Sequence, residues 1–297
     1  MAAAIDKHVH MLVHAAFEPS FRVKYSRVEE VRQPADIEHP LFREALIRHW
    51  RADAPLEIAS LADVPAGTGM GSSGAFVVCL LKALACARGT TIAPAPLAEA
   101  ACEIEIEILR EPVGKQDQYV AAHGGFRGYI FHRDGAVTVE SLELSPATLG
   151  RLRRQLMLFF TGETRSASAI LADQDIRSRS DDPAMVANLD RTKAIGREVC
   201  ALLEAGDVDG FAELMHEHWL NKRRRSPAIA DARTDALYKL ARRYGAIGGK
   251  LLGAGGGGFL LVVSRSPERT RSAMLGEGAV EIPFEFDFRG AVATTVA

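Results

Sequence analysis

The pattern of apolar and polar residues predicts β-strands at the start of the chain. Over residues 5–14 the side chains alternate, with apolar residues mainly at odd positions and histidines at most even ones. This period of two is typical of a half-buried strand, and we predict one over residues 5–13. A turn is expected at residues 18–20, followed by a second strand over residues 21–28.

Helical periods follow these strands. Apolar residues at positions 41, 45, 46 and 50 form one stripe, which predicts an amphipathic helix over residues 40–50. A short strand at residues 56–60 leads into a glycine-rich segment. The apolar stretch after it, residues 75–87, is predicted to be a buried helix that ends before a C′ glycine. A further helix is expected over residues 94–109, because Pro112 stops it.

The second half of the chain has a different pattern of predicted strands and helices. A hairpin is predicted from strands over residues 127–132 and 136–142, closed by Gly135. Three elements are expected after it: a strand over residues 155–161, a mostly helical stretch over 166–244, and a glycine loop between apolar strands. We therefore divide the chain into two domains, residues 1–150 and 151–297.

Composition narrows the class of protein. The 297 residues are 47% hydrophobic and 25% charged, as in ordinary globular proteins, and 36 basic against 38 acidic residues leave a formal charge of −2. Such a balance gives no electrostatic footprint for nucleic acid. The four cysteines form no CxxC pair, and the longest apolar run, residues 76–87, is too short to span a bilayer. The N-terminus has an acid at Asp6 and no basic stretch before an apolar core, so we expect no signal peptide. We expect a cytoplasmic protein without nucleic-acid or membrane partners.

The segment PAGTGMGSSGA, residues 65–75, combines small residues with the start of a predicted helix. Its glycines let the backbone approach a ligand, and its serines open the helix, where unpaired N–H groups and a positive dipole favour an anion. We predict a phosphate site here, with a tight turn as the alternative. The residues expected to form it are Pro65, Gly67, Gly69, Gly71, Ser72 and Ser73.

Two well-known phosphate motifs do not fit this segment. Residues 69–74 match GxGxxG, but no acidic residue follows about 20 positions later to hold a ribose. The Walker A motif requires a lysine directly after its glycines, and the first lysine after the glycines of this segment is Lys82. A dinucleotide-dependent oxidoreductase is therefore a distant alternative.

The segment EPVGKQDQY, residues 111–119, contains candidate catalytic residues. Asp117 is expected at the start of a helix, where capping keeps a carboxylate ionised and able to accept a proton. Lys115 is placed to neutralise phosphate charge; a simple N-cap with a surface lysine is the alternative. Upstream, acidic residues alternate over 103–107, so at least one is expected to face the interior or a cleft, with Mg²⁺ as a natural partner. The alternative is three solvated glutamates.

A second glycine-rich segment has five glycines among the six positions 253–258. Each costs roughly 0.5–1 kcal/mol relative to alanine. We expect another backbone or a ligand to press against this loop, because a bare hairpin would need only one or two glycines. The candidate binding positions are Gly253, Gly255, Gly256 and Gly257.

Two polar clusters have less specific interpretations. His8, His10 and His14 share a predicted strand face, but no carboxylate or cysteine is spaced to complete a metal site, so we favour no metal there. The basic run at residues 222–225 is interpreted as a solvated face or a helix end, with an anion contact as the alternative.

Taken in order, PAGTGMGSSGA, GKQDQY and KLLGAGGGGF resemble the motifs of the GHMP kinase superfamily of small-molecule kinases. AAAIDKHVH, DIEHPLFREAL, ACEIEIEIL, FTGETRSASAIL and HEHWLNK add a closer resemblance to its D-glycero-D-manno-heptose 7-phosphate kinase branch, so that the likeness covers nearly the whole chain. The resemblance implies an α+β fold, with an N-terminal domain like ribosomal protein S5 domain 2 and a C-terminal ferredoxin-like domain.

The resemblance also implies roles for individual residues. The loop at residues 67–73 would wrap the ATP phosphates, and residues 253–258 would close the site. Ser73 and Glu105 would coordinate Mg²⁺, Asp117 would be the general base, and Lys115 would lie near the sugar or the transferred phosphate. Contacts to the substrate are expected from Asp6, Lys7, Gly125 and Arg165.

The function that the resemblance implies is ATP-dependent phosphorylation of the heptose 7-phosphate at its anomeric hydroxyl, which gives the 1,7-bisphosphate. One departure keeps alternatives open. Family members begin with a strand and loop of the form PLRISFFGGGTD, and this sequence starts after it, so we expect either a start assigned too late or a native truncation. The alternatives are a kinase for another sugar, such as fucose, and a non-catalytic protein that binds nucleotide or sugar phosphate. The unpaired edge of the strand at 5–13 makes a homodimer a further option.

Overall fold

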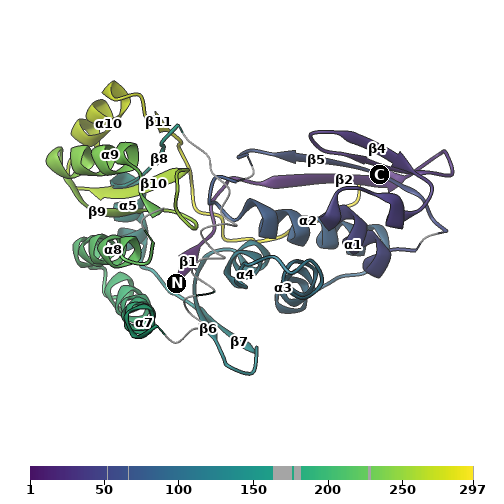
Figure 1. The fold of residues 1–297 in the computed structure, drawn as a ribbon, viewed down its shortest axis with the longest axis horizontal. Helices are drawn as coiled ribbons and strands as arrows, with labels where there is room; N and C mark the ends of the chain where they lie inside the picture. The colour runs from purple at the N-terminus through teal and green to yellow at the C-terminus, as the bar shows by residue number, and fades with distance from the viewer. Residues whose placement is uncertain (52, 66, 163–175, 177–181, 227–228, 297) are drawn as a thin grey trace. The chain divides into compact units, whose positions relative to one another are not determined.

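The computed structural model of the protein describes residues 1–51, 53–65, 67–162, 176, 182–226 and 229–296 (Figure 1). The chain divides into two compact units, each built from three separate stretches. What we call the N-terminal unit comprises residues 3–65, 71–125 and 286–297. What we call the C-terminal unit comprises residues 1–2, 66–70 and 126–285.

These units do not follow the predicted division at residue 150. The main change of unit falls between Gly125 and Phe126, and the final segment, residues 286–297, returns to the N-terminal unit. Hydrogen bonds explain this return, because the Gly125 N–H donates to the Asp287 carbonyl at 2.7 Å and the Asp287 N–H donates to that of Ala4 at 3.0 Å. The division into family domains at residue 150 stays a prediction.

A four-stranded sheet forms one layer of the N-terminal unit, with the order β2-β5-β3-β4. Its strands are β2 (Val9–Ala15), β3 (Phe21–Lys24), β4 (Val28–Val31) and β5 (Leu56–Ala62). β5 pairs antiparallel with β2 and parallel with β3. The first strand of this sheet begins at Val9 and not at residue 5 as predicted. Ile5 instead forms an isolated bridge with Phe286.

The helix that follows the first glycine-rich loop packs against β2, and the other helices of this unit pack on it or on one another (Figure 1). The helices of this unit are the short η1 (Pro34–Asp36), α1 (Pro40–His49), α2 (Ser72–Ala87), α3 (Pro94–Cys102) and α4 (Gln116–His123). The predicted helices over 40–50 and 75–87 are confirmed. The core between helices and sheet includes Phe21, Phe42 and Ile58, all 0% exposed, and each such side chain contributes roughly 1.5–3 kcal/mol by its burial.

The predicted helix over 94–109 is α-helical only as far as Cys102. Residues 103–108 form the π-helical segment η2 (Glu103–Ile108), in which the Leu109 N–H donates to the Ile104 carbonyl at 3.0 Å. Such wider turns are often found at functional sites. Here the wider turn holds one glutamate in the interior, as described below.

The C-terminal unit contains an antiparallel four-stranded sheet with the order β11-β8-β10-β9. The strands are β8 (Leu156–Phe160), β9 (Ala246–Leu251), β10 (Phe259–Ser264) and β11 (Val280–Glu281). The described helices are α5 (Pro146–Gln155), α7 (Pro183–Glu204), α8 (Val208–Arg223), α9 (Ala232–Arg243) and α10 (Pro267–Gly276). A separate three-stranded sheet has the order β1-β6-β7, with β1 (Ala2–Ala3), β6 (Phe126–Phe131) and β7 (Val137–Ser141).

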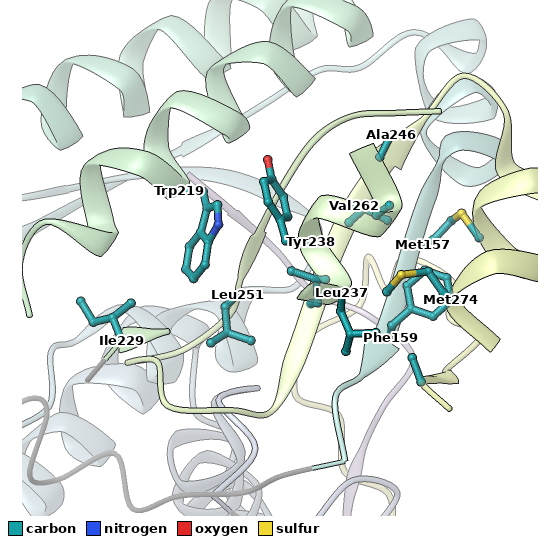
Figure 2. Close-up of a cluster of buried hydrophobic side chains, with 13 residues drawn as sticks. Met157, Phe159, Trp219, Ile229, Leu237, Tyr238, Ala246, Leu251, Val262 and Met274 are labelled. Carbon is teal, nitrogen blue, oxygen red and sulfur yellow. The ribbon is translucent and has the colours of Figure 1, made fainter. Parts of the chain in front are cut away.

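The core of the C-terminal unit joins its helices to its sheet. Figure 2 shows Trp219 of α8 and Tyr238 of α9 beside side chains of β8, β9 and β10, such as Phe159 and Leu251. Both helices pack against β9. The predicted hairpin, the strand near 155–161 and the strands around the second glycine loop are confirmed, whereas α5 and α10 were not predicted. None of the helices among the described residues is long and apolar enough to cross a membrane.

Candidate functional site

The first part of the 65–75 loop packs against the second glycine loop within the C-terminal unit. A Cβ atom placed on Gly253 would lie 2.4 Å from the Gly69 Cα, and one on Gly258 would lie 2.3 Å from the Thr68 carbonyl oxygen. No side chain fits at such distances. The expectation that another backbone presses against residues 253–258 is therefore confirmed, and the glycines allow two backbones to meet.

Gly67 differs from these packed glycines. Its φ of +77° lies in the left-handed region, yet no described atom lies within 4 Å of the position that a Cβ would take. Gly67 therefore faces open space. A ligand therefore has room beside Gly67, whereas the space beside Gly69 is occupied by the backbone of Leu252 and Gly253.

The second part of the loop lies in the N-terminal unit, at the start of α2. Gly71, with a φ of +73°, is the residue before the helix, and a Cβ there would lie 3.0 Å from the Asp117 Cγ. A Cβ on Gly74 would lie 3.1 Å from the Asp117 Cβ. Glycine at these two positions lets the carboxylate approach the first turn of α2, whose N–H groups attract anions.

Glu105 is the glutamate that η2 turns inward. It is 1% exposed and accepts hydrogen bonds from the Ser73 hydroxyl and, at 2.5 Å, from Gln118 Nε2. Its neighbours Glu103 and Glu107 are exposed, so the expectation that one of the three faces inward is confirmed. Desolvation raises the pKa of the Glu105 carboxyl, and the negative charge of Asp117 adds to the rise.

These residues fit a magnesium ion. A serine hydroxyl and a carboxylate are the oxygen ligands that Mg²⁺ prefers, and a nearby cation would offset the cost of a charged, buried Glu105. Gln118 Oε1 is a buried acceptor with no hydrogen-bond partner among the described atoms. That oxygen has the capacity to accept from a water or to bind a ligand. Gln118 was missed from the sequence, although its place directly after Asp117 was a usable signal.

Asp117 lies in the first turn of α4, as predicted, but its side chain caps nothing there. The expectation that capping keeps it ionised is therefore wrong. Desolvation by surrounding protein instead raises the pKa of its carboxyl. The residue remains solvent-accessible, so water limits this rise. A raised pKa makes the carboxylate a stronger proton acceptor once it is ionised.

Lys115 contacts a carboxylate that the sequence did not single out. Its Nζ lies 2.9 Å and 3.1 Å from the two carboxylate oxygens of Glu99, which also accepts a hydrogen bond from the Tyr119 hydroxyl. Glu99 thus anchors the residue at the N-cap of α4. The expected role of Lys115 beside a phosphate stays a prediction.

Among the predicted substrate residues, Gly125 contacts the chain two positions before Asp6, and Arg165 is outside the described residues. Gly125, with a φ of +70°, accepts at its carbonyl from the Ala4 N–H at 3.1 Å. Lys7 Nζ lies 3.1 Å from the Asp6 carboxylate. Their roles toward a sugar stay predictions.

The basic run at 222–225 lies at the end of α8, so the helix-end interpretation is confirmed, but Lys222 is not solvated. Lys222 is 6% exposed, and its Nζ donates to the carbonyl oxygens of Leu251 at 3.0 Å and Gly253 at 2.5 Å. Burial lowers the pKa of Lys222 well below its ordinary value, and Lys250 and Arg225 lower it further. The sequence did contain a signal, because Lys222 follows the buried Trp219 by three positions and shares its helix face.

Comparison with known proteins identifies the family. The family model described as GHMP kinases N terminal domain matches residues 41–125, and the model described as GHMP kinases C terminal matches residues 200–276. A D-glycero-alpha-D-manno-heptose 7-phosphate kinase of Campylobacter jejuni is 32% identical over 67% of this chain, and the match spans 58% of that relative. The bifunctional fucokinase/GDP-fucose pyrophosphorylase of Arabidopsis thaliana is 26% identical over 73% of this chain and 20% of its own length.

The fold agrees with these matches. The crystal structure of a D-glycero-D-manno-heptose 1-phosphate kinase from Bacteroides thetaiotaomicron superposes with a TM-score of 0.76 at 24% identity, covering 97% of this chain and 87% of that one. The predicted α+β fold of two family domains is confirmed. The paired domain matches, the glycine loops and the cluster of Ser73, Glu105 and Asp117 lead to one conclusion: this chain belongs to the GHMP kinase family.

Proposed function

We propose that the chain is an ATP-dependent sugar kinase that phosphorylates the anomeric hydroxyl of D-glycero-D-manno-heptose 7-phosphate. The observation that carries the proposal is the group of oxygen ligands and a carboxylate at the first turn of α2. Ser73 and Glu105 touch through a hydrogen bond, and Asp117 lies against Gly71 and Gly74. Phosphoryl transfer needs such a group, because catalysis consists mainly of positioning and charge neutralisation.

Asp117 is assigned the role of general base. It accepts the proton of the sugar hydroxyl while the hydroxyl oxygen forms a bond to the γ-phosphorus of ATP. The bond from that phosphorus to the oxygen bridging it to the β-phosphate breaks, and ADP leaves. The raised pKa of Asp117 supports this role, because the carboxylate is a better proton acceptor than an ordinary aspartate.

Ser73 and Glu105 are assigned the role of binding Mg²⁺. The ion would neutralise and bridge phosphate oxygens of the nucleotide when bound. The N–H groups at the start of α2 suit the phosphate chain itself.

Lys222 and the second glycine loop are assigned a positioning role. The Lys222 amino group donates to the carbonyls of Leu251 and Gly253, and these lead into a loop whose glycines pack on Thr68 and Gly69. The second glycine loop therefore supports the backbone of the first glycine loop at Thr68 and Gly69. Closing the nucleotide site, the role expected of residues 253–258, stays a prediction.

The heptose phosphate is favoured as acceptor by the similarity to the Campylobacter kinase. The Arabidopsis relative keeps fucose as the alternative acceptor. A non-catalytic protein that binds nucleotide or sugar phosphate is the alternative of a different class, and it predicts ATP binding without ADP formation.

The test is Mg²⁺-dependent ADP release with the heptose 7-phosphate, fucose, galactose and mannose as acceptors. We expect turnover with the heptose phosphate, lost in Asp117→Asn and kept in Asp190→Asn, which alters an exposed aspartate on α7. Turnover with fucose alone would move the proposal to the second acceptor. ATP binding without turnover on any acceptor would contradict the kinase and favour the binding protein.

A further inference from the structure

A cluster of two histidines and an aspartate lies at one end of the sheet in the N-terminal unit. His8 and His10 are two positions apart at the start of β2, and Asp63 directly follows β5. The strand register pairs His10 with Leu61 and continues past β5, where the Asp63 N–H donates to the His8 carbonyl at 3.0 Å. The expectation that no carboxylate completes this histidine face is therefore wrong, because antiparallel pairing supplies one from 55 residues away.

The three side chains converge on a small volume. One ligand atom from each lies within 4.8 Å of the others. His10 Nε2 is 3.7 Å from Asp63 Oδ1, and His8 Nδ1 is 3.9 Å from Asp63 Oδ2. Ligands about 2.0–2.1 Å from a tetrahedral zinc ion lie about 3.4 Å from one another. The two histidine–aspartate distances exceed this value by only a few tenths of an ångström.

A second carboxylate orients His8 from the other side. His8 Nε2 lies 2.9 Å from Asp287 Oδ2, and the Asp287 side chain is only 10% exposed. A carboxylate can only accept a hydrogen bond, so the hydrogen of neutral His8 lies on Nε2 and its Nδ1 lone pair faces Asp63. Metal-binding histidines commonly have such a carboxylate on the ring nitrogen that does not bind the metal.

Asp287 is itself fixed in place. Its second carboxylate oxygen, Oδ1, accepts from the Arg289 N–H at 2.6 Å, and its backbone bonds to Gly125 and Ala4. Asp63 is held in a similar way, because the His8 N–H donates to its Oδ2 at 2.9 Å.

We propose that His8, His10 and Asp63 form a site for a divalent transition-metal ion, with Zn²⁺ the preferred ion and Asp287 the residue that orients His8. Two imidazoles and one carboxylate suit zinc and leave a coordination position open. Mg²⁺ is a poor occupant, because it prefers oxygen ligands in octahedral geometry. The site is separate from the cluster of Ser73, Glu105 and Asp117, so it does not depend on the proposed function.

The occupied site would tie three stretches of chain together. His8 and His10 lead into β2, Asp63 follows β5, and Asp287 belongs to the C-terminal segment. A ligand that binds only the folded state raises the melting temperature. Zn²⁺ is therefore expected to raise the Tm of the full chain.

The test is equilibrium dialysis of the full chain, prepared without a histidine tag, against ZnCl2 in the presence of excess MgCl2. Bound zinc is counted by mass spectrometry. We expect one equivalent of zinc, at least about tenfold weaker binding in His10→Gln and Asp63→Asn, and about 10–100-fold weaker binding in Asp287→Asn. His14→Gln is the matched control, because His14 lies on the same strand, is 65% exposed and is outside the cluster.

Co²⁺ in place of zinc supplies a second measurement that does not depend on folding stability. Intense visible absorption, lost in His10→Gln and kept in His14→Gln, would support a low-coordinate site with nitrogen ligands. Three results would overturn the proposal: no stoichiometric zinc, zinc retained at full affinity in His10→Gln, or equal losses in His10→Gln and His14→Gln. Each of these results would show that the histidines and aspartates form no specific metal site.

Discussion

The two glycine-rich loops have similar sequences, but their glycines meet different needs. In the first loop, Gly67 faces open space, and Gly71 and Gly74 admit the Asp117 side chain to the start of α2. In the second loop, Gly253 and Gly258 are pressed against the backbone of the first. A run of glycines therefore signals close approach without telling what approaches. Only the neighbours decide between a ligand, a carboxylate and another backbone.

The largest expected effect concerns the carboxylate beside the first loop. Asp117→Asn should lower kcat by about 10²–10⁴-fold, because general-base catalysis is worth that much, while ATP affinity changes little. Steady-state kinetics of ADP release and an ATP-binding titration measure the two quantities. Asp190→Asn is the control, and a kcat within twofold of the wild type in Asp117→Asn would remove Asp117 as the base.

Substituting one glycine in each loop separates ligand access from backbone packing. Gly67→Ala should cost about 1–2 kcal/mol of stability from its left-handed backbone alone, and should raise the KM for ATP. Gly253→Ala should cost about 1–3 kcal/mol more, because its Cβ would lie 2.4 Å from the Gly69 Cα. Urea unfolding of both variants measures the difference. Equal losses of stability would show that the loops are not packed as described.

Lys222 tests how the second loop supports the first. Lys222→Met should lower the free energy of unfolding by about 1–3 kcal/mol, because the carbonyls of Leu251 and Gly253 lose their buried donor. The KM for ATP should rise more than kcat falls, since the loop shape changes and the base does not. Lys239→Met, on an exposed position of α9, is the matched control. A neutral Lys222→Met would contradict the positioning role.

The pH dependence gives the smallest effect. The base must be ionised, and desolvation raises the pKa of Asp117 above its ordinary 3.8, so activity should fall as the pH falls through this raised value. The acid limb of kcat/KM should therefore lie at higher pH than an ordinary aspartate would give. A profile that stays flat down to pH 4 would contradict a desolvated base.

Many of the helices and strands could be predicted from the local pattern of apolar, polar and turn residues. The helix of residues 72–87 was predicted because an apolar run follows two serines and ends before Gly89, and the structure confirms it. The hairpin around Gly135 was predicted from alternation and one turn residue. Segment η2 was not, because a π-helical turn has no distinct signature among alternating glutamates and isoleucines.

The candidate site divides in the same way. The inward turn of one glutamate was predicted from the two-residue period of the acids, but Glu105 was chosen among the three only through the family resemblance. The Glu99 anchor of Lys115 and the burial of Lys222 were missed, because each depends on a partner 16 or more residues away.

The sequence by itself determined what depends on neighbouring residues: most of the strands and helices, the glycine loops, the family and the chemical types of the site residues. The tertiary structure alone decided what depends on partners far along the chain. It placed Asp63 beside His8 and His10, turned Lys222 into the loop, and packed Gly253 on Gly69. The physical reason is that hydrophobic periods and turn chemistry act over a few residues, whereas burial, desolvation and ligand geometry arise only when distant segments pack together.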